Sequence, residues 1–238
     1  MLQSPQWKDG HFENPEPLVN DLWASMLGFL NRSEHISPHD KVSVLNVDLA
    51  LLATAPASGL RVTWMGHSSV LIEIDEYRVL TDPIWAQRAS PLPWVGPQRW
   101  YDPRIALAKL PKLDAVVISH DHYDHLDHAT VVAMKDWNTK FVVSLGVAAH
   151  LEYWGVAPSK IVELDWWEHV TIGTLQVHCT PAPIGTLVPS KPCWPTTLCK
   201  GVCSCPFTGL CFRWRSTAGP SPLNVWSPQV PSLSSSPA

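Results

Sequence analysis

The stretch SHDHYDHLD, residues 119–127, decides the fold and the chemistry of this chain. It packs three histidines and three aspartates into nine positions. The residues directly before it, DAVVIS at 114–119, form a continuous apolar run, which is typical of a strand buried on both faces of a sheet. Loops that follow such strands hold the functional sites of α/β folds. Because imidazole and carboxylate groups are ligands of zinc and similar cations, the stretch predicts a divalent-metal site.

The spacing within this stretch suits two neighbouring cations. His120 and His122 are two residues apart and can converge on one metal, whereas Asp124 and His125 can turn to a second metal a few ångströms away. Two metals that share a hydroxide suit hydrolysis, because they supply a nucleophile at neutral pH and stabilise both oxygens of a displacement. A solvated histidine-rich turn is the alternative interpretation, and the buried strand before the stretch favours the metal site.

Outward from this stretch, the pattern alternates between strands and helices. Three short strands are expected first, at 61–65, 69–74 and 77–81. Later strands are expected at 141–144, 160–164, 169–172 and 174–178, with helices at 128–136 and 147–154. Strands followed by alternating helices and strands predict a layered α/β fold.

Composition restricts the classes of protein. The chain has 238 residues, of which 45% are hydrophobic and 16% charged, as in globular proteins. No apolar run approaches the roughly 18 residues of a membrane-spanning helix, and the N-terminus lacks a secretory signal pattern. The net charge of −4 argues against nucleic-acid binding through bulk charge. We therefore expect a cytoplasmic protein, with peripheral membrane contact left open.

Four further segments resemble one known family. They are WMGHSS at 64–69, TDP at 81–83, RASP at 88–91 and GPQRW at 96–100. Together with the 119–127 stretch they resemble the metallo-β-lactamase superfamily. The similarity is to the branch that contains N-acyl-phosphatidylethanolamine-hydrolysing phospholipase D and bacterial lactonase-like relatives. The resemblance spans roughly residues 62–182 and implies an αββα sandwich, of which this chain would hold about the first half.

The resemblance also implies a ligand set. His120 and His122 would bind the first zinc ion, and Asp124 and His125 the second, so that two zinc ions occupy an intact site. Asp124, which lies next to the reacting atoms in this scheme, is also expected to take part in catalysis.

Three more residues are expected to support these ligands from behind. Asp82, at a strand end, resembles the buried aspartate that braces the metal loop in this superfamily. His67 lies in a Gly-His-Ser turn, where a hydrogen-bonded structural histidine and a residue of the pocket are both open interpretations. Asp127 is expected to organise the loop rather than to bind metal.

The family pattern breaks off after Thr180-Pro181-Ala182. Relatives continue with a His-Trp pair, a Gly-Asp turn and a last histidine, but no His, Asp or Glu follows residue 182 here. Three expected ligands are therefore absent, and each metal keeps two of its protein ligands. We expect the chain as printed to be inactive, with the core face of its half-sandwich exposed.

Residues 183–238 read as a Pro-, Ser- and Cys-rich tail without regular secondary structure. They carry 10 of the 23 prolines and five of the six cysteines. Back-translation near Ala182 permits a small residue, His and Trp in a shifted frame, so a frame or splice change is the favoured explanation. A genuine cysteine site is the alternative, although the spacing holds no Cys-x-x-Cys pair. The expected division is an arm with an amphipathic helix (1–60), a partial domain (61–182) and this tail (183–238).

Three functions remain open at this point. The first is a zinc phosphodiesterase that cleaves a phospholipid into an N-acylated amine compound and phosphatidic acid, with access through the Trp-rich loop 83–103 and the helix expected at 17–31. The second is a hydrolase of lactones or other small esters with the same fold. The third is a non-catalytic truncated product or binding module. A phospholipid or small ester is the expected partner, nucleic acid is not, and the oligomeric state stays open.

Overall fold

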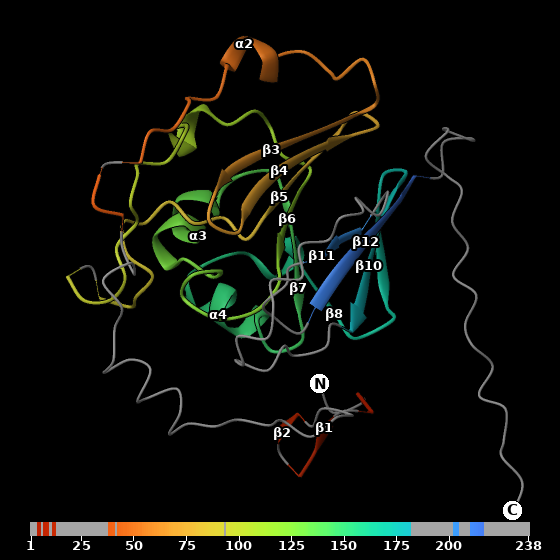
Figure 1. The fold of residues 1–238 in the computed structure, drawn as a ribbon. Helices are drawn as coiled ribbons and strands as arrows, with labels where there is room; N and C mark the ends of the chain where they lie inside the picture. Colours follow the sequence, from red (N-terminus) through yellow and green to blue (C-terminus); the bar gives the residue numbers. More distant parts are fainter. Residues whose placement is uncertain are drawn as a thin grey trace, which may run out of the picture.

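The computed structural model describes residues 4–5, 7–9, 11–12, 38–40, 42–92, 94–181, 202–204 and 210–216. Two β-sheets lie face to face, and helices cover the outer face of the larger sheet (Figure 1). This arrangement is the layered α/β fold that the sequence predicts. The helix expected at 17–31 lies outside the described residues.

The larger sheet has six strands in the order β3-β4-β5-β6-β7-β8. Their bounds are β3 Leu60–Gly66, β4 Ser69–Ile74, β5 Tyr77–Thr81, β6 Ala115–Ile118, β7 Lys140–Ser144 and β8 Ile161–Leu164. The first three strands pair antiparallel, and β5 to β8 pair parallel. The turn between β4 and β5 is tight because Asp75 and Glu76 both have positive φ angles, 45° and 72°, as hairpin turns that match strand twist require. All six strands were predicted from the sequence, with ends that differ by at most one residue.

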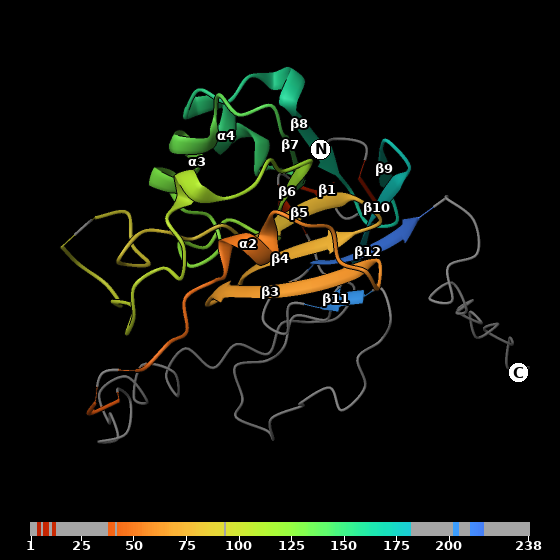
Figure 2. The ribbon, with the colours of Figure 1, turned by 90° about the horizontal axis from the view of Figure 1, so that it is seen from above.

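The helical layer packs on one face of this sheet. It contains α3 His128–Met134 and α4 Ala148–Tyr153, both predicted, and the short α2 Leu49–Leu52, which was not. Figure 2 shows α3 and α4 together on the same side of the sheet. Phe141, Met134 and Leu151 are fully buried in the core between these layers. Leu52 of α2 belongs to the same core, so this part of residues 1–60 packs with the domain.

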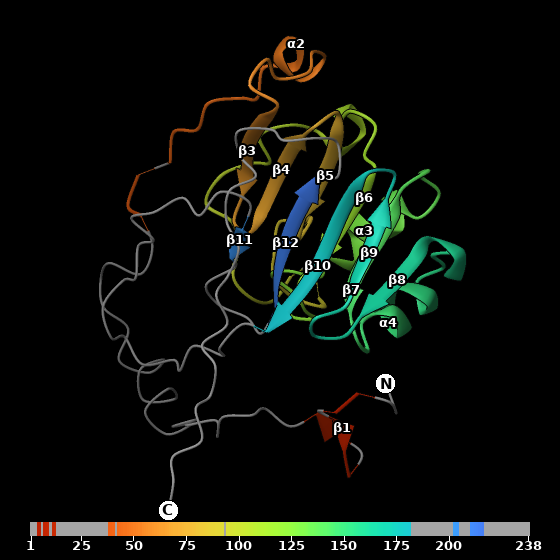
Figure 3. The same cartoon turned by 90° about the vertical axis from the view of Figure 1, so that its right-hand side faces the viewer.

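The second sheet covers the opposite face. Its strands are β9 His169–Ile172, β10 Leu175–Pro181, β11 Val202–Ser204 and β12 Leu210–Ser216, in the order β11-β12-β10-β9. Figure 3 shows this sheet in front of the larger one. Val79, Val117 and Val142 of the larger sheet pack against Leu175 and Val177 of β10, and each is at most 2% exposed.

Two expectations change here. The core face of the larger sheet is covered at these positions rather than exposed, because β9 and β10 already supply part of the partner sheet. Strands β11 and β12 lie within 183–238, where no regular secondary structure was predicted. Both pair antiparallel within the second sheet, with β12 next to β10. A short hairpin of β1 Trp7–Lys8 and β2 His11–Phe12 is likewise unpredicted.

Strand pairing brings several strand ends to one edge of the larger sheet. Gly66 pairs with Ser69, Val70 with Thr81, and Thr81 with Val117. The turn after β3, the end of β5 and the end of β6 therefore lie side by side at this edge, although they are far apart in the chain. Among the described residues, no helix is long and apolar enough to cross a membrane.

Candidate metal centre

The loop after β6 folds back on itself and brings several of its ligand-type side chains together. Backbone N–H groups of His125 and Leu126 both donate to the carbonyl of His122, at 2.8 and 2.7 Å. The rings of His120 and His122 lie 4.5 Å apart, and those of His120 and His125 lie 4.1 Å apart, measured between centroids. The fold of this short loop thus brings together the residues that the sequence predicts as metal ligands.

Two groups of possible ligand atoms form at this place. One contains His120, His122 and Asp124, and the other contains His67, Asp124 and His125. Within each group the ligand atoms lie within 4.8 Å of one another. Asp124 belongs to both groups, so its carboxylate stands between two potential cation positions.

Asp82 fixes the orientation of the loop from behind. Its side chain is 1% exposed, and its Oδ1 accepts from the backbone N–H of Ser119 at 2.7 Å. Its Oδ2 accepts from the hydroxyl of Ser119 at 2.9 Å and from Nδ1 of His125 at 2.9 Å. A carboxylate oxygen accepts hydrogen bonds, so Nδ1 of His125 is the donor in this contact and Nε2 is the ring nitrogen left to face a cation. A carboxylate behind a ligating histidine is the usual support of metal sites.

The same carboxylate sets the tautomer of His120 through a serine. Because the hydroxyl proton of Ser119 is donated to Asp82, the serine oxygen accepts from Nδ1–H of His120 at 2.9 Å. Nε2 of His120 then carries a lone pair, and it is buried without a hydrogen-bond partner among the described residues. Burial, followed by the neighbouring His125 and His122, lowers the pKa of His120 to about 4. His120 is therefore a neutral imidazole at pH 7, the form that binds metal.

Asp124 carries the charge of the centre. Its Oδ2 lies 3.2 Å from Nε2 of His67 and 3.7 Å from Nε2 of His125. The hydrogen bond from His67 is the main cause that lowers the pKa of Asp124 to about 2, against an opposing effect of burial. The carboxylate is therefore ionised at neutral pH.

The donor set fits a divalent cation. Three groups here offer lone pairs to a cation. They are Nε2 of His120, which has no hydrogen-bond partner among the described residues, Nε2 of His125 and the ionised carboxylate of Asp124. Zinc accepts such nitrogen and oxygen ligands, and so does iron(II) with two histidines and one carboxylate. The side chains fit a metal of this class without selecting zinc within it.

Asp127 lies outside both ligand groups and hydrogen-bonds to two neighbouring segments, α3 and the loop after β5. Its Oδ1 accepts from the backbone N–H of Ala129 and so caps α3, while its Oδ2 accepts from the N–H groups of Trp85 and Ala86 and from the hydroxyl of Thr130. One carboxylate thereby joins the metal loop, the helix after it and the loop after β5.

His67 is the residue whose position the sequence left most open. It lies in the turn between β3 and β4 with a φ angle of 48°, and its ring contacts the metal loop from another part of the sheet. Residue spacing could not find this neighbour of Asp124, which lies 57 positions away in the chain. The signal that could have found it is strand order. Because β3 and β5 both run antiparallel to β4, their C-terminal ends lie at the same edge of the sheet.

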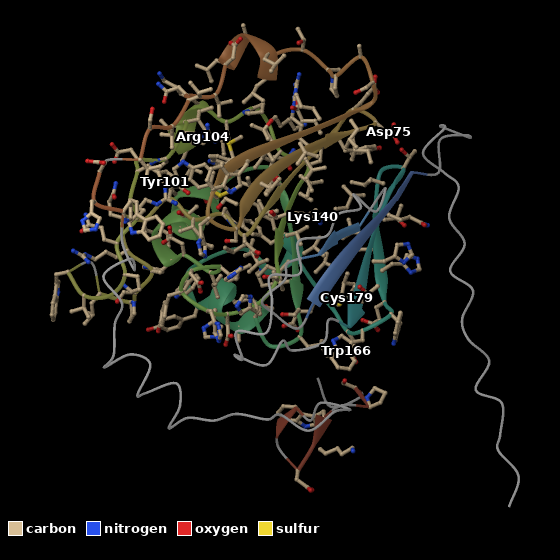
Figure 4. The ribbon with its side chains drawn as sticks, viewed as in Figure 1. Asp75, Tyr101, Arg104, Lys140, Trp166 and Cys179 are labelled. Atoms are coloured by element: carbon tan, nitrogen blue, oxygen red, sulfur yellow. The ribbon has the colours of Figure 1, made fainter. Side chains whose placement is uncertain are left out.

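A cleft of about 1270 Å³ opens over the centre. Residues of both ligand groups line it, among them His67, His122 and Asp124. Its apolar wall is formed by side chains from the loop after β5 and from neighbouring elements, namely Trp64, Ile84, Trp100, Tyr101 and Trp154. Figure 4 labels Tyr101 and Arg104 on this part of the molecule. The volume exceeds the usual 300–1,000 Å³ of a small-molecule pocket, which leaves room for a long apolar group.

Residues 77–196 match the family model described as a beta-lactamase superfamily domain. An uncharacterised protein of Mycobacterium tuberculosis is 45% identical over 187 residues, which cover 76% of this chain and 50% of that protein. N-acyl-phosphatidylethanolamine-hydrolysing phospholipase D 1 of Caenorhabditis elegans is 34% identical over 192 residues, covering 72% of this chain and 53% of that protein. The chain thus spans about half the length of these relatives.

Among solved structures, a possible metal-dependent hydrolase of Veillonella parvula aligns with a TM-score of 0.44 and 18% identity. The alignment covers 53% of this chain and 49% of that protein.

Proposed function

The chain belongs to the beta-lactamase superfamily, and from this premise we propose that its metal site is that of a hydrolase acting on the phosphodiester bond of an N-acylated phospholipid, a site of which the chain as printed lacks three expected ligands after Ala182. The proposal rests above all on one observation. Two groups of candidate metal-ligand side chains share Asp124, which lines a large and mostly apolar cleft. The similarity to the nematode phospholipase supports the choice of substrate class.

The side chains have distinct tasks in this reaction. When bound, a divalent cation lowers the pKa of coordinated water and neutralises charge that develops on phosphoryl oxygens. His120 and His122 offer ring nitrogens to one cation position, and Asp82 holds Nδ1 of His125, which leaves Nε2 of that ring to the second position. Asp124 supplies a negative charge to both positions, which fits its predicted part in catalysis.

Access for a lipid is supported by the loop after β5. Leu92, Trp94, Val95 and Trp100 are exposed large apolar side chains, and Trp94 is 71% exposed. They lie on the loop that supplies Trp100 to the cleft wall. Apolar groups at this position would contact acyl chains at a membrane surface and lower the cost of moving a lipid into the cleft. We propose peripheral membrane contact through this loop.

The test measures release of phosphatidic acid from vesicles that contain an N-acylated phosphatidylethanolamine, by mass spectrometry. The chain is assayed with Zn²⁺, Mn²⁺ or Fe²⁺ and with a chelator. Release that needs metal and is lost in His122→Ala, but not in the distant His169→Ala, would support the proposal. Hydrolysis of a lactone without release of phosphatidic acid would favour the small-ester alternative. Bound metal without turnover of either substrate would favour a non-catalytic binding module.

Membrane contact has a separate test with a matched pair of exposed tryptophans. Trp94→Ser should reduce sedimentation of the chain with phospholipid vesicles by roughly three- to tenfold, since partial burial of one large aromatic side chain contributes less than the roughly 1.5–3 kcal/mol of full burial. Trp167→Ser replaces a side chain that is 74% exposed between β8 and β9 and should leave sedimentation unchanged. Equal behaviour of the two variants would contradict contact through the loop.

A further inference from the structure

The turn between β3 and β4 holds its histidine in a conformation that needs support. His67 has a φ angle of 48°, a left-handed conformation that costs a residue with a side chain about 1 kcal/mol or more. Asn or Gly would be the ordinary residue at such a position. Strain of this kind persists only where neighbouring contacts fix it, and it is concentrated at functional sites.

Hydrogen bonds fix this turn from both sides. Nε1–H of Trp64 donates to the carbonyl of His67 at 2.8 Å, and the backbone N–H of His67 donates to the hydroxyl of Tyr101 at 3.2 Å. The hydroxyl of Ser68 donates to the backbone carbonyl of Asp124 at 3.0 Å, which ties the turn directly to the metal loop. Gly66 permits the approach of Tyr101, because a Cβ atom there would lie 3.2 Å from its ring.

The result is an imidazole aimed at the shared carboxylate. Nε2 of His67 lies 3.2 Å from Oδ2 of Asp124, and its ring centroid lies 5.7 Å from that of His125. The ligand atoms of His67, Asp124 and His125 lie within 4.8 Å of one another. His67 is half exposed and lines the cleft, so a cation held by the three residues would face the substrate.

We propose that His67 is itself a metal ligand, the third protein ligand beside Asp124 and His125. This inference rests on the metal centre of the proposed function and deepens it. Two imidazoles and one carboxylate make a three-ligand site, the number that catalytic zinc sites use while keeping a position open. All three ligands lie between residues 67 and 125.

The rival role for His67 is positioning. Its Nε2–H could donate to Asp124 and orient that carboxylate without touching metal, as ligand-supporting groups commonly do. The two roles differ in what a glutamine does at this position. A glutamine amide nitrogen can reach Asp124 as a hydrogen-bond donor, but the amide is a poor ligand compared with an imidazole.

The experiment titrates Co²⁺ into the full chain by calorimetry and follows its visible absorption bands, which respond to the number and kind of ligands. If His67 is a ligand, His67→Gln and His67→Asn should both weaken one Co²⁺ site by roughly tenfold or more. Changing a residue that only supports a ligand already costs roughly 10–100-fold, so loss of a ligand should not cost less. Both should also change the absorption bands. Asn suits the left-handed turn, so this variant tests the ligand with the backbone conformation retained. His169→Ala, a histidine on β9 outside both groups, should stay within about twofold of the wild type, well short of that loss.

Three results would overturn the inference. Retained affinity and bands in His67→Gln would assign His67 a positioning role, and retained affinity in both variants would assign it no role in metal binding. In either case, loss of a Co²⁺ site in His125→Ala would leave the proposed metal centre standing. Absence of Co²⁺ binding by the wild-type chain would overturn the metal centre and this inference together.

Discussion

Two loops meet at Asp124, and they are built in opposite ways. The loop after β6 carries six ligand-type side chains in nine positions, follows a fully buried parallel strand and is braced by the buried Asp82. The turn between β3 and β4 carries one such side chain, His67, on an antiparallel hairpin, and its support comes from backbone hydrogen bonds to aromatic residues. The comparison teaches that strand pairing brings the parts of such a centre together at a sheet edge. A cluster of ligand-type residues in the sequence reveals the loop after β6 but not the turn that faces it.

The largest expected effect follows from removing the residue that both loops share. Asp124→Ala takes a ligand from both groups and removes the only carboxylate in either of them. We expect Zn²⁺ affinity to fall more than roughly 100-fold. Removing a ligand should exceed the roughly 10–100-fold effect of changing a residue that only supports a ligand. Equilibrium dialysis with metal analysis measures it. Retention of two tightly bound ions would contradict the shared role of Asp124.

The next effect tests the bracing of the loop after β6. Asp82→Asn places an amide where three hydrogen bonds converge, so that Ser119 and His125 lose the acceptor that fixes the tautomers. We expect metal affinity to fall roughly 10–100-fold and the free energy of unfolding to fall by about 1–3 kcal/mol. Asp102→Asn, in which an exposed aspartate changes in the same way, is the control. Unchanged affinity in Asp82→Asn would show that the loop keeps its shape without this support.

The third effect concerns protons on the metal-free chain. His120 has an ordinary pKa of 6.5 and a folded-state pKa of about 4, so between these pH values the unfolded chain binds a proton that the folded chain excludes. The free energy of unfolding therefore decreases as the pH falls from 6.5 towards 4, by on the order of 1 kcal/mol after allowance for the solvent-exposed part of the ring. Urea denaturation with chelator at pH 7 and pH 5 measures it. His120→Gln should show a smaller decrease, and an equal decrease would contradict burial of this imidazole.

The smallest effect tests the support of the turn between β3 and β4. Tyr101→Phe removes the hydroxyl that accepts from the backbone of His67 while the ring that packs on Gly66 remains. One neutral hydrogen bond contributes about 0.5–1.5 kcal/mol, so we expect metal affinity to fall by roughly two- to tenfold. Tyr153→Phe changes a side chain that is 89% exposed on α4 and is the control. A loss as large as that of Asp82→Asn would contradict this ranking and show that the turn depends on Tyr101 as much as the loop after β6 depends on Asp82.

Local sequence determined the elements and one side of the centre. The alternation of Val70 to Ile74 and the apolar run from Ala115 to Ile118 predict their strands, because burial on one or both faces of a sheet imposes these patterns directly. The four ligands from His120 to His125 are close in the chain, so their spacing alone predicts that they converge. No strand was expected after Ala182, yet β12 carries the alternation of a strand, with Leu210, Phe212 and Trp214 separated by Cys211, Arg213 and Arg215, and it pairs with β10.

Only the tertiary structure decided which distant groups complete the site. Asp82, His67 and the aromatic wall of the cleft come from three other strand ends and loops, and their contacts depend on the order β3-β4-β5-β6 in the sheet. Strand order depends on long-range pairing and core packing, which leave no periodic mark at a single turn. The sequence by itself therefore predicted a metal site and determined which loop carries most of its candidate ligands. Strand pairing decided that the histidine of another turn faces Asp124 and that the centre opens into an apolar cleft.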